Sequence, residues 1–322
     1  MEKGKKSKII IGIIASAVLI AGAIFAKSVQ KGREPLMKDC FALDTFCTLT
    51  IYEGGNEGVL ELFSDELNRL EALFSPELKG SDIWNINNRE GSSVRIDALT
   101  AKMLQEAKSI SDASDGALLP TIRPLTVIWN FKNEVVPGEE EILKAMEASN
   151  NARWSITEKE DGFYFEADDA LTKIETGAFA KGYIADVLKE RLVGEGVRSA
   201  VIDLGGNVLT IGSKPDGTPF RVGIKDPRDG NSLINVVEIS DESVVTAGTY
   251  ERYFEKVGRR YHHILDKSTG YPAESGLLSV TVIGKSSFTC DALATAALVL
   301  GREKAEAMMV QFPGYEIYFV EE

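Results

Sequence analysis

The chain has 322 residues, of which 44% are hydrophobic and 26% charged, which is the composition of an ordinary globular protein. Seven of the 36 basic residues but only two of the 49 acidic residues lie within residues 1–34, so the remaining 288 residues carry a net charge of −18. A field of that sign repels nucleic acid and anionic lipid, and it favours a site where a cation offsets an anionic ligand. The three cysteines cannot all pair and lack metal-ligand spacing, which excludes a disulfide scaffold and a zinc site.

The first 34 residues combine a lysine-rich start with one long apolar run. Residues 9–26 carry no charge, and as a helix they would span about 27 Å at roughly 1.5 Å per residue, close to the hydrocarbon thickness of a bilayer. A cleavable signal peptide is the alternative, because residues 21–23 (AGA) resemble a cleavage site, although they lie inside the apolar run. We expect one uncleaved transmembrane helix in the cell membrane. The lysine cluster favours a cytoplasmic N-terminus, so residues 35–322 are expected to form an extracytoplasmic domain.

After a polar linker over residues 27–39, apolar residues recur with the periods of strands and helices. Residues 48–52 predict a strand, and residues 56–74 predict a helix with one apolar stripe. Further helices are predicted after Ser81, between Asp97 and Asp115, and at residues 139–149, 178–192, 290–300 and 302–310. Further strands are predicted at residues 154–156, 163–165, 200–204, 207–211, 220–224, 236–239, 261–265, 278–283 and 316–320. This mixture lacks a repeating βαβ pattern and predicts an α+β fold of mainly antiparallel sheets flanked by helices.

A glycine-rich segment at residues 175–183 (ETGAFAKGY) leads into one of the predicted helices. Glycines let the backbone approach a ligand, and Lys181 near the helix start adds positive charge to N–H groups that favour phosphate. A tight turn with a solvated lysine is the alternative. Residues 199–207 (SAVIDLGGN) predict a strand that runs into a turn, which indicates at most a role in shaping a pocket.

Two further segments carry candidates for metal binding and proton transfer. Asp291 and Thr295 are four residues apart, so on a helix they present a carboxylate and a hydroxyl on one face, a ligand pair that suits Mg²⁺. Asp291 as a simple helix N-cap is the alternative. The only two histidines, His262 and His263, lie at the end of a predicted strand, where functional residues concentrate.

Together with residues 74–87 and 116–131, these segments occur in the order found in the ApbE family of flavin transferases, which the chain resembles from about residue 43 to residue 301. The resemblance implies Mg²⁺-dependent transfer of FMN from FAD to a threonine hydroxyl of an acceptor protein, with release of AMP. It implies that His263 is the base and that Lys181 steadies a phosphate. It also implies metal ligation by Asp291, Thr295 and the Ala178 carbonyl. The flavin-binding positions that it implies are Leu43, Ser75, Glu77, Ala117, Leu118, Leu119, Glu175, Lys181 and Ile264.

The chain departs from the family pattern at four of these positions. Leu43 stands where the family has Met, Glu77 where it has Tyr, and Leu119 and Glu175 where it has Asp. Because Leu119 removes a hydrogen-bond acceptor and Glu77 removes a stacking ring, we expect weaker FAD binding.

Two alternative functions stay open. One is an FAD pyrophosphatase that uses water as the nucleophile, and the other is a flavin-binding surface protein that has lost catalysis. The chain contains no Ser/Thr-Gly-Ala-Thr segment of the kind expected in an acceptor, so the acceptor is expected to be another protein.

Overall fold

The computed structural model describes residues 34–229 and 232–322. The membrane anchor expected at residues 9–26 lies outside these ranges, and no helix within them is long and apolar enough to cross a bilayer. Residues Pro35–Glu322 form one compact unit.

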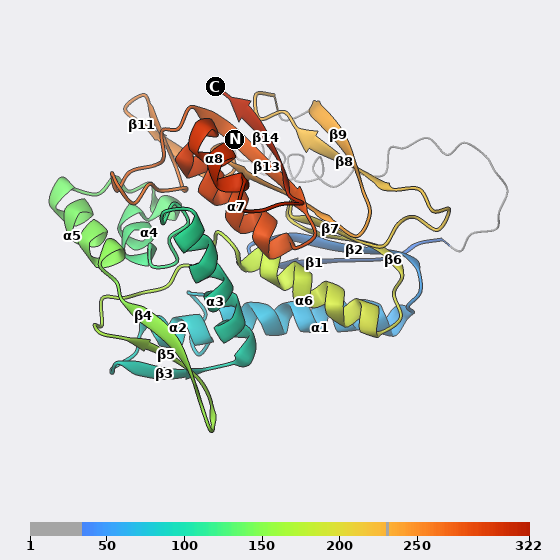
Figure 1. The fold of residues 1–322 in the computed structure, drawn as a ribbon, viewed down its shortest axis with the longest axis horizontal. Coiled ribbons are helices and arrows are strands. Elements are labelled where there is room, and N and C mark those ends of the chain that lie inside the picture. The colour runs from blue at the N-terminus through green and yellow to red at the C-terminus, as the bar shows by residue number, and fades with distance from the viewer. Residues whose placement is uncertain (1–33, 230–231) are drawn as a thin grey trace, which may run out of the picture. The chain divides into compact units, whose positions relative to one another are not determined.

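A seven-stranded sheet forms the centre of this unit (Figure 1). All neighbouring strands run antiparallel, which confirms the predicted fold class. In spatial order the strands are β1 (Leu36–Ala42), β2 (Thr45–Glu53), β6 (Ser199–Leu204), β7 (Val208–Ile211), β10 (Ser243–Gly248), β13 (Leu277–Gly284) and β14 (Glu316–Glu321).

Two strands of this sheet, β1 and β10, were not predicted from the sequence. β1 lies largely within residues that were predicted to be a polar linker. It was not predicted as a strand because the charged Lys38 and Asp39 obscure the alternation of half-buried and exposed side chains along this edge strand. β10 was not predicted as a strand.

The two faces of the central sheet are covered differently. α1 (Glu57–Phe74), α6 (Ala180–Gly194) and α7 (Ser287–Leu300) pack on one face, and α8 (Arg302–Met309) follows α7. The hairpin of β8 (Phe220–Lys225) and β9 (Leu233–Ile239) packs on the other. The alternation of strand side chains explains this arrangement. Val245 and Val282 belong to the main core beneath the helices, whereas their neighbours Val244 and Ile283 pack against the hairpin.

A second group of elements lies beside the helical layer. It contains a three-stranded sheet of β3 (Ser93–Ile96), β5 (Gly162–Ala167) and β4 (Trp154–Lys159), with α2 (Asp82–Asn87) and α3 (Ala98–Ala113) beside it. It also contains α4 (Arg123–Trp129), η1 (Phe131–Asn133), α5 (Glu139–Asn150) and the hairpin of β11 (Tyr253–Lys256) and β12 (Arg259–His262).

Trp129 is the centre of a small aromatic core in this second group. Its ring packs against Phe131, Tyr261 and Tyr271, and its Nε1–H donates to the Gly270 carbonyl at 2.8 Å. Trp129 is fully buried, so this part of the predicted flavin segment is a core element. The segment predicted as one strand at residues 261–265 is divided. β12 ends at His262, and β11 was not predicted.

Candidate active site

The contact between α6 and α7 depends on one glycine, Gly182, and one half-buried carboxylate, Asp186. A Cβ atom on Gly182 would lie 2.4 Å from the Ser287 carbonyl oxygen, so only glycine lets the helices approach this closely. Asp186 accepts hydrogen bonds from Ser287 N at 2.9 Å and Phe288 N at 3.0 Å, and thereby caps α7. Ser287 also donates from its hydroxyl to Asn207 in the β6–β7 turn, at 2.6 Å. These bonds fix the start of α7 against α6 and against the edge of the sheet.

The predicted metal ligands lie along the same seam. Asp291 is 6% exposed, and its Oδ2 accepts the Gly182 N–H at 3.0 Å. The N-cap of α7 is Ser286, so the alternative that Asp291 is a simple cap is wrong. Asp186 contacts residues 286–288 and Gly182 contacts Asp291, so the helices meet in antiparallel order. Thr295 lies one turn after Asp291 on α7, and Ala178 lies two residues before α6 begins.

Three oxygen atoms along this seam have the chemistry of a magnesium site. Because Gly182 N–H donates to Asp291, it does not bond the Ala178 carbonyl. Within residues 34–229 and 232–322, the Ala178 carbonyl, Asp291 Oδ1 and the Thr295 hydroxyl take part in no hydrogen bond. A carboxylate, a hydroxyl and a carbonyl therefore fit a hard cation. The described residues contain no cluster of three His, Cys, Asp or Glu side chains of the kind that holds a metal by itself.

Lys181 places a positive charge beside this seam. It is half-buried, and in the described part of the chain it forms no ion pair. Burial raises the pKa of Asp291, and Lys181 opposes that rise. Burial also raises the pKa of Glu251, an effect that Lys181 opposes and Asp291 reinforces. Lys181, Asp291 and Glu251 therefore lie within electrostatic range of one another, and the sequence analysis did not identify Glu251.

The two histidines have different roles. His263 Nδ1 lies 3.1 Å from the Arg252 carbonyl oxygen, which can only accept, so Nδ1 carries the hydrogen and Nε2 keeps a lone pair. The pKa of His263 is lowered to about 4. Burial is the main cause, the hydrogen bond to the Arg252 carbonyl opposes it, and electrostatic repulsion from Arg252, His262 and Lys181 adds to the lowering. The imidazole is therefore neutral at pH 7. His262 is buried, and its Nε2 lies 3.0 Å from the Ala273 carbonyl oxygen, which marks it as a structural residue.

Part of the predicted flavin pocket forms a hollow where α1 ends. Glu71, Ser75, Glu77 and Leu78 line this space of about 360 Å³, which we call the Ser75 hollow. Ser75 Oγ accepts the N–H groups of Glu77 and Leu78, at 3.3 and 3.1 Å. Leu43 lies outside the strands of the sheet. With φ of 55° it occupies the β1–β2 turn, where its N–H donates to Glu71 Oε1 at 3.0 Å.

The remaining predicted flavin residues differ in burial and in the elements that carry them. Leu118 is 2% exposed and Ile264 7%, and both side chains belong to the main core. Ala117 and Leu119 are half-buried in the loop between α3 and α4. Glu175 joins this loop through its own N–H, which donates to the Pro120 carbonyl at 2.8 Å.

Arg123 joins two predicted pocket residues, although the sequence analysis did not identify it. Its Nη2 lies 2.6 Å from Glu77 Oε1 and its Nη1 lies 2.8 Å from Glu175 Oε2. Burial lowers the pKa of Arg123, but Glu175 and Glu77 outweigh that effect and raise it. We call this group, Glu77–Arg123–Glu175, the Arg123 bridge. Its members are 46 and 52 residues apart, so no local sequence pattern indicates it.

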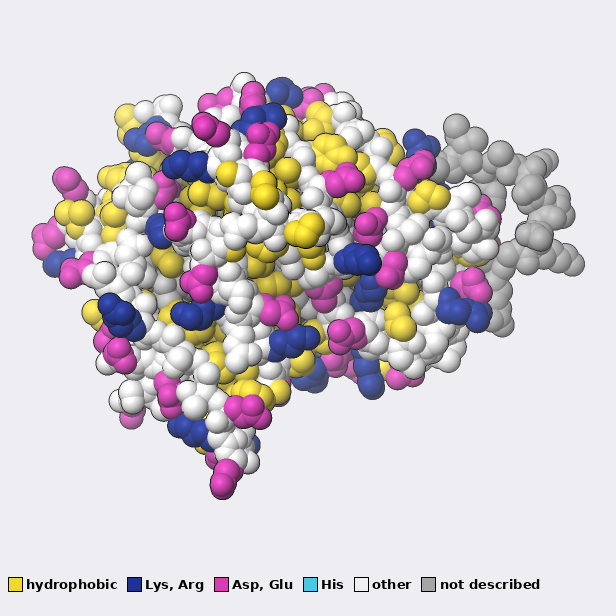
Figure 2. Space-filling view, in the orientation of Figure 1, with side chains coloured by type: hydrophobic (Ala, Val, Ile, Leu, Met, Phe, Trp, Pro, Cys, Tyr) yellow, Lys and Arg dark blue, Asp and Glu magenta, His cyan; other side chains and the backbone are white. Residues whose placement is uncertain are grey.

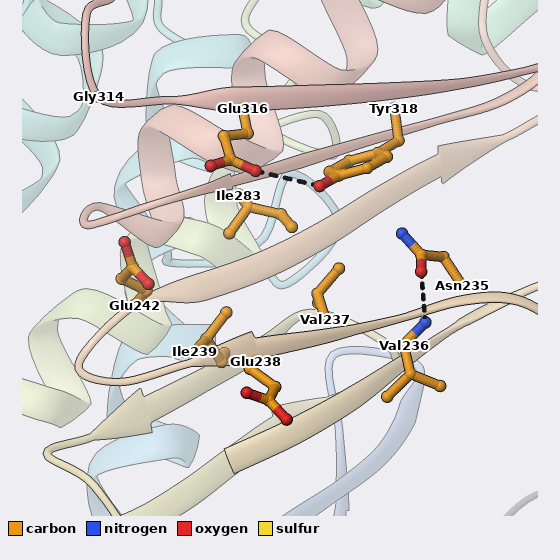
Figure 3. Close-up of a pocket in the computed structure, with 10 residues that line it drawn as sticks. All are labelled: Asn235, Val236, Val237, Glu238, Ile239, Glu242, Ile283, Gly314, Glu316 and Tyr318. Carbon is orange, nitrogen blue, oxygen red and sulfur yellow. Dashed lines mark hydrogen bonds between the residues drawn. The ribbon is translucent and has the colours of Figure 1, made fainter. Parts of the chain in front are cut away.

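A second hollow lies on the other face of the central sheet and contains no predicted site residue (Figure 3). β9, β13 and β14 provide most of its lining, and Tyr318 donates to Glu316 there at 3.0 Å. Acidic and basic side chains are interspersed over the molecular face shown in Figure 2. That face offers no single-sign patch as a competing site.

Comparison with known proteins identifies close relatives. Residues 43–319 match the model of the ApbE family. A Treponema pallidum protein named FAD:protein FMN transferase is 31% identical over 300 residues, which cover 86% of this chain and 82% of the relative. A Klebsiella pneumoniae protein of the same name is 35% identical and covers 79% of each chain.

Solved structures show the same similarity. The ApbE protein of Thermotoga maritima has a TM-score of 0.81 and 30% identity, covering 89% of this chain and 94% of that one. The apo form of the Pseudomonas stutzeri flavinyl transferase ApbE has a TM-score of 0.79 and 30% identity, covering 90% and 92%.

Proposed function

This chain belongs to the ApbE family, and on that premise we propose that it is an FAD:protein FMN transferase. The single observation that carries the proposal is the α6–α7 seam. There, a glycine contact holds Asp291 and Lys181 within electrostatic range of each other, and Lys181 also acts on His263. A phosphate-binding cation, a buried carboxylate and a neutral imidazole thus occur together. Phosphoryl transfer to a hydroxyl uses a base for the hydroxyl proton and positive charge against the phosphates, which these groups can supply.

In the proposed reaction, a threonine hydroxyl oxygen of the acceptor attacks the FMN-side phosphorus of FAD. The new P–O bond joins FMN to the threonine, the pyrophosphate bond breaks, and AMP leaves with the bonding electron pair. His263 Nε2 accepts the hydroxyl proton, because the Arg252 carbonyl holds the other ring nitrogen in its protonated form. Lys181 offsets the negative charge of the phosphates.

The pKa of about 4 makes His263 a weak base in the free protein. Burial is the main cause of that low value, and the positive charges of Lys181 and Arg252 add to it because they disfavour the imidazolium form. A bound anionic pyrophosphate counteracts both charges. We therefore propose that FAD itself raises the basicity of His263 when it binds.

We also propose that the Ala178 carbonyl, Asp291 and Thr295 hold Mg²⁺. When bound there, the ion supplies positive charge against the pyrophosphate. The support is the chemistry of the three oxygen atoms described above and the strongly acidic character of the domain, which otherwise repels FAD.

The proposal also covers the location of the enzyme and its acceptor. The lysine-rich start and the apolar residues 9–26 support a single-pass anchor with residues 35–322 extracytoplasmic. Protease added to intact cells should then remove the domain, whereas full protection in cells permeable to the protease would contradict this topology. The acceptor is a separate protein with a Ser/Thr-Gly-Ala-Thr-like segment.

Labelling of such an acceptor tests the function. The full chain with FAD, Mg²⁺ and the acceptor should add one FMN to the threonine and release AMP, as seen by intact-mass analysis and chromatography. Chelation of Mg²⁺ should stop both. AMP and free FMN without labelling would establish the pyrophosphatase, and bound FAD with neither product would establish a binding protein.

A further inference from the structure

Two of the three cysteines lie directly opposite each other in the central sheet. β1 and β2 pair as an antiparallel hairpin whose register places Cys40 against Cys47. The two-residue turn fixes this register, because Leu43 and Asp44 both have positive φ, 55° and 57°. Opposite residues of antiparallel strands have Cα atoms about 4.5–5.5 Å apart, and a disulfide joins Cα atoms about 4.4–6.8 Å apart. The spacing of the two strands therefore suits a disulfide between these side chains.

The two thiol side chains also share one face of the sheet. Cys47 is fully buried and Cys40 half-buried, and both pack into the main core beneath the helices. The third cysteine, Cys290, lies on α7, where its Sγ donates to the Ser243 carbonyl of β10 at 3.9 Å. Since β6 and β7 separate β10 from β2, this contact is about 14 Å from β2 at the usual strand spacing. Cys40 and Cys47 are therefore partners for each other and not for Cys290.

Burial determines when these thiols can react. It raises the pKa of Cys40, and it raises the pKa of Cys47 to about 12, with the neighbouring Cys40 adding to the rise. Because the thiolate is the reacting form, both thiols are nearly inert in the folded domain. Before α1 packs on the hairpin they are solvated and can exchange with a disulfide. A bond that forms at that stage is afterwards covered by α1 and shielded from reductants.

We propose that Cys40 and Cys47 form a cross-strand disulfide that fastens the edge strand β1 to β2. The oxidant is another disulfide, of a protein or of a small thiol. The Cys40 thiolate attacks one sulfur of the oxidant, whose S–S bond breaks and releases one thiol. Cys47 then attacks Cys40 Sγ, the mixed disulfide breaks, and the second thiol leaves. Two electrons pass to the oxidant, and its two thiols carry away the two cysteine protons.

The bond would lie where the sheet most needs a covalent link. β1 is the outermost strand, with one neighbour among the strands that the structure describes, and edges of this kind open most readily. In the sequence it follows the segment that leads from the apolar residues 9–26. Its turn carries Leu43, whose N–H donates to Glu71 at the Ser75 hollow. A bond that closes the loop of residues 40–47 holds both the strand and this turn, and it is one local link rather than a disulfide scaffold.

Cell-free synthesis of the full chain with lipid vesicles tests this inference, because the oxidant can then act while the hairpin folds. One preparation contains glutathione disulfide and the other contains none. Alkylation in denaturant without reductant should modify one of the three cysteines in the first and all three in the second, as measured by intact mass. Cleavage after Lys38 and Arg69 gives one peptide, residues 39–69, that should be lighter by two hydrogen atoms in the oxidised chain. Three alkylated cysteines in both preparations, or a bond that includes Cys290, would overturn the inference.

Two matched variants assign the bond. With glutathione disulfide present, Cys40→Ala should leave both remaining cysteines open to alkylation, whereas Cys290→Ala should leave none. Cys40 is half-buried and at the sheet edge, so its substitution leaves Cys47 in the core unchanged. Protection that persists in Cys40→Ala would show that burial or another partner, and not a bond to Cys40, shields Cys47.

Thermal unfolding tests whether the bond fastens the strand. The oxidised wild type should have a Tm about 2–6 °C above that of the reduced wild type, as expected for a bond that closes a short loop. Cys40→Ala should have the same Tm in both preparations. Tryptophan fluorescence follows the transition. Equal Tm values of the two wild-type forms, with the bond present by mass, would show that it does not hold β1.

These measurements involve neither FAD nor an acceptor, so the inference does not rest on the transferase activity. The proposed extracytoplasmic location predicts that the chain isolated from cells carries the bond, since disulfides persist in oxidising compartments. A bond in the cell-free product and free thiols in the chain from cells would contradict the location and leave the inference standing. Free thiols in both would reject the inference whatever the location.

Discussion

The α6–α7 seam and the Arg123 bridge bring together segments that are far apart in the sequence, but by different means. At the seam, the absence of a side chain at Gly182 lets the backbone of α6 approach the Ser287 carbonyl, and the Gly182 N–H donates to the Asp291 carboxylate. At the bridge, long charged side chains span the gaps between loops, as Arg123 does between Glu77 and Glu175.

This difference accounts for two of the four departures of the chain from its family. The matched residues Lys181, His263 and Asp291 belong to the seam or lie within its electrostatic range. The departures at Glu77 and Glu175 belong to the bridge, where Arg123 pairs with both. A close backbone contact tolerates no added atom, whereas a second long side chain can compensate for a change in a loop.

The largest effect is expected at the base. His263→Ala should lower kcat by about 10²- to 10⁴-fold, the usual loss when a general base is removed. Stopped-assay labelling of the acceptor measures it, and added imidazole should restore part of the rate because it can enter the space left by the ring. A variant with wild-type kcat would remove His263 from the mechanism.

Gly182→Ala tests the close contact at the seam. The added Cβ would lie 2.4 Å from the Ser287 carbonyl oxygen and must push α6 from α7. Overpacking of this kind lowers the free energy of unfolding by about 1–3 kcal/mol. Displacement of Asp291 from Lys181 should reduce kcat by about 10- to 100-fold.

Gly194→Ala is the matched control, because Gly194 lies on the same helix and a Cβ there meets nothing within 4 Å. It should keep wild-type activity and stability in urea titration. Equal behaviour of the two variants would show that the helices do not need their close approach.

The sequence predicted the seam better than the bridge, for physical reasons. Helical periodicity located α1, α6 and α7, and the four-residue spacing of Asp291 and Thr295 identified one face of α7. The close antiparallel packing of α6 against α7 depends on Gly182, and no periodicity of the local sequence indicates it. α4 was not predicted, because a seven-residue helix with Pro124 in its first turn shows little periodicity. Consequently Arg123 was not identified, since only the fold brings it to Glu77 and Glu175.

The pH dependence should follow from the low pKa of His263. Since kcat/KM reports the free enzyme, its acidic limb should lie near pH 4, whereas that of kcat should lie higher because bound FAD raises the pKa. Rate profiles at saturating and limiting FAD measure both. Coincident limbs would contradict the proposed effect of the substrate.

The low pKa of His263 also makes the free energy of unfolding depend on pH. Between pH 4 and 6.5 the unfolded chain binds more protons at His263 than the folded chain does, so this contribution is complete above 6.5 and is lost as the pH falls towards 4. His263→Ala should therefore flatten the rise of the unfolding free energy across this interval. An unchanged slope would show that His263 is solvated in the folded protein.

The smallest effect is expected from restoring the family residue at Leu119. Leu119→Asp supplies a hydrogen-bond acceptor for FAD, but it adds a third carboxylate near a bridge in which one guanidinium already pairs with Glu77 and Glu175. The two effects oppose each other, so the Kd for FAD should change by less than about threefold, since a net hydrogen bond contributes only about 0.5–1.5 kcal/mol. In a Glu77→Tyr background one carboxylate is gone and a ring is restored, so the same substitution should lower the Kd more. Equal changes of the Kd in both backgrounds would show that position 119 is not coupled to the bridge.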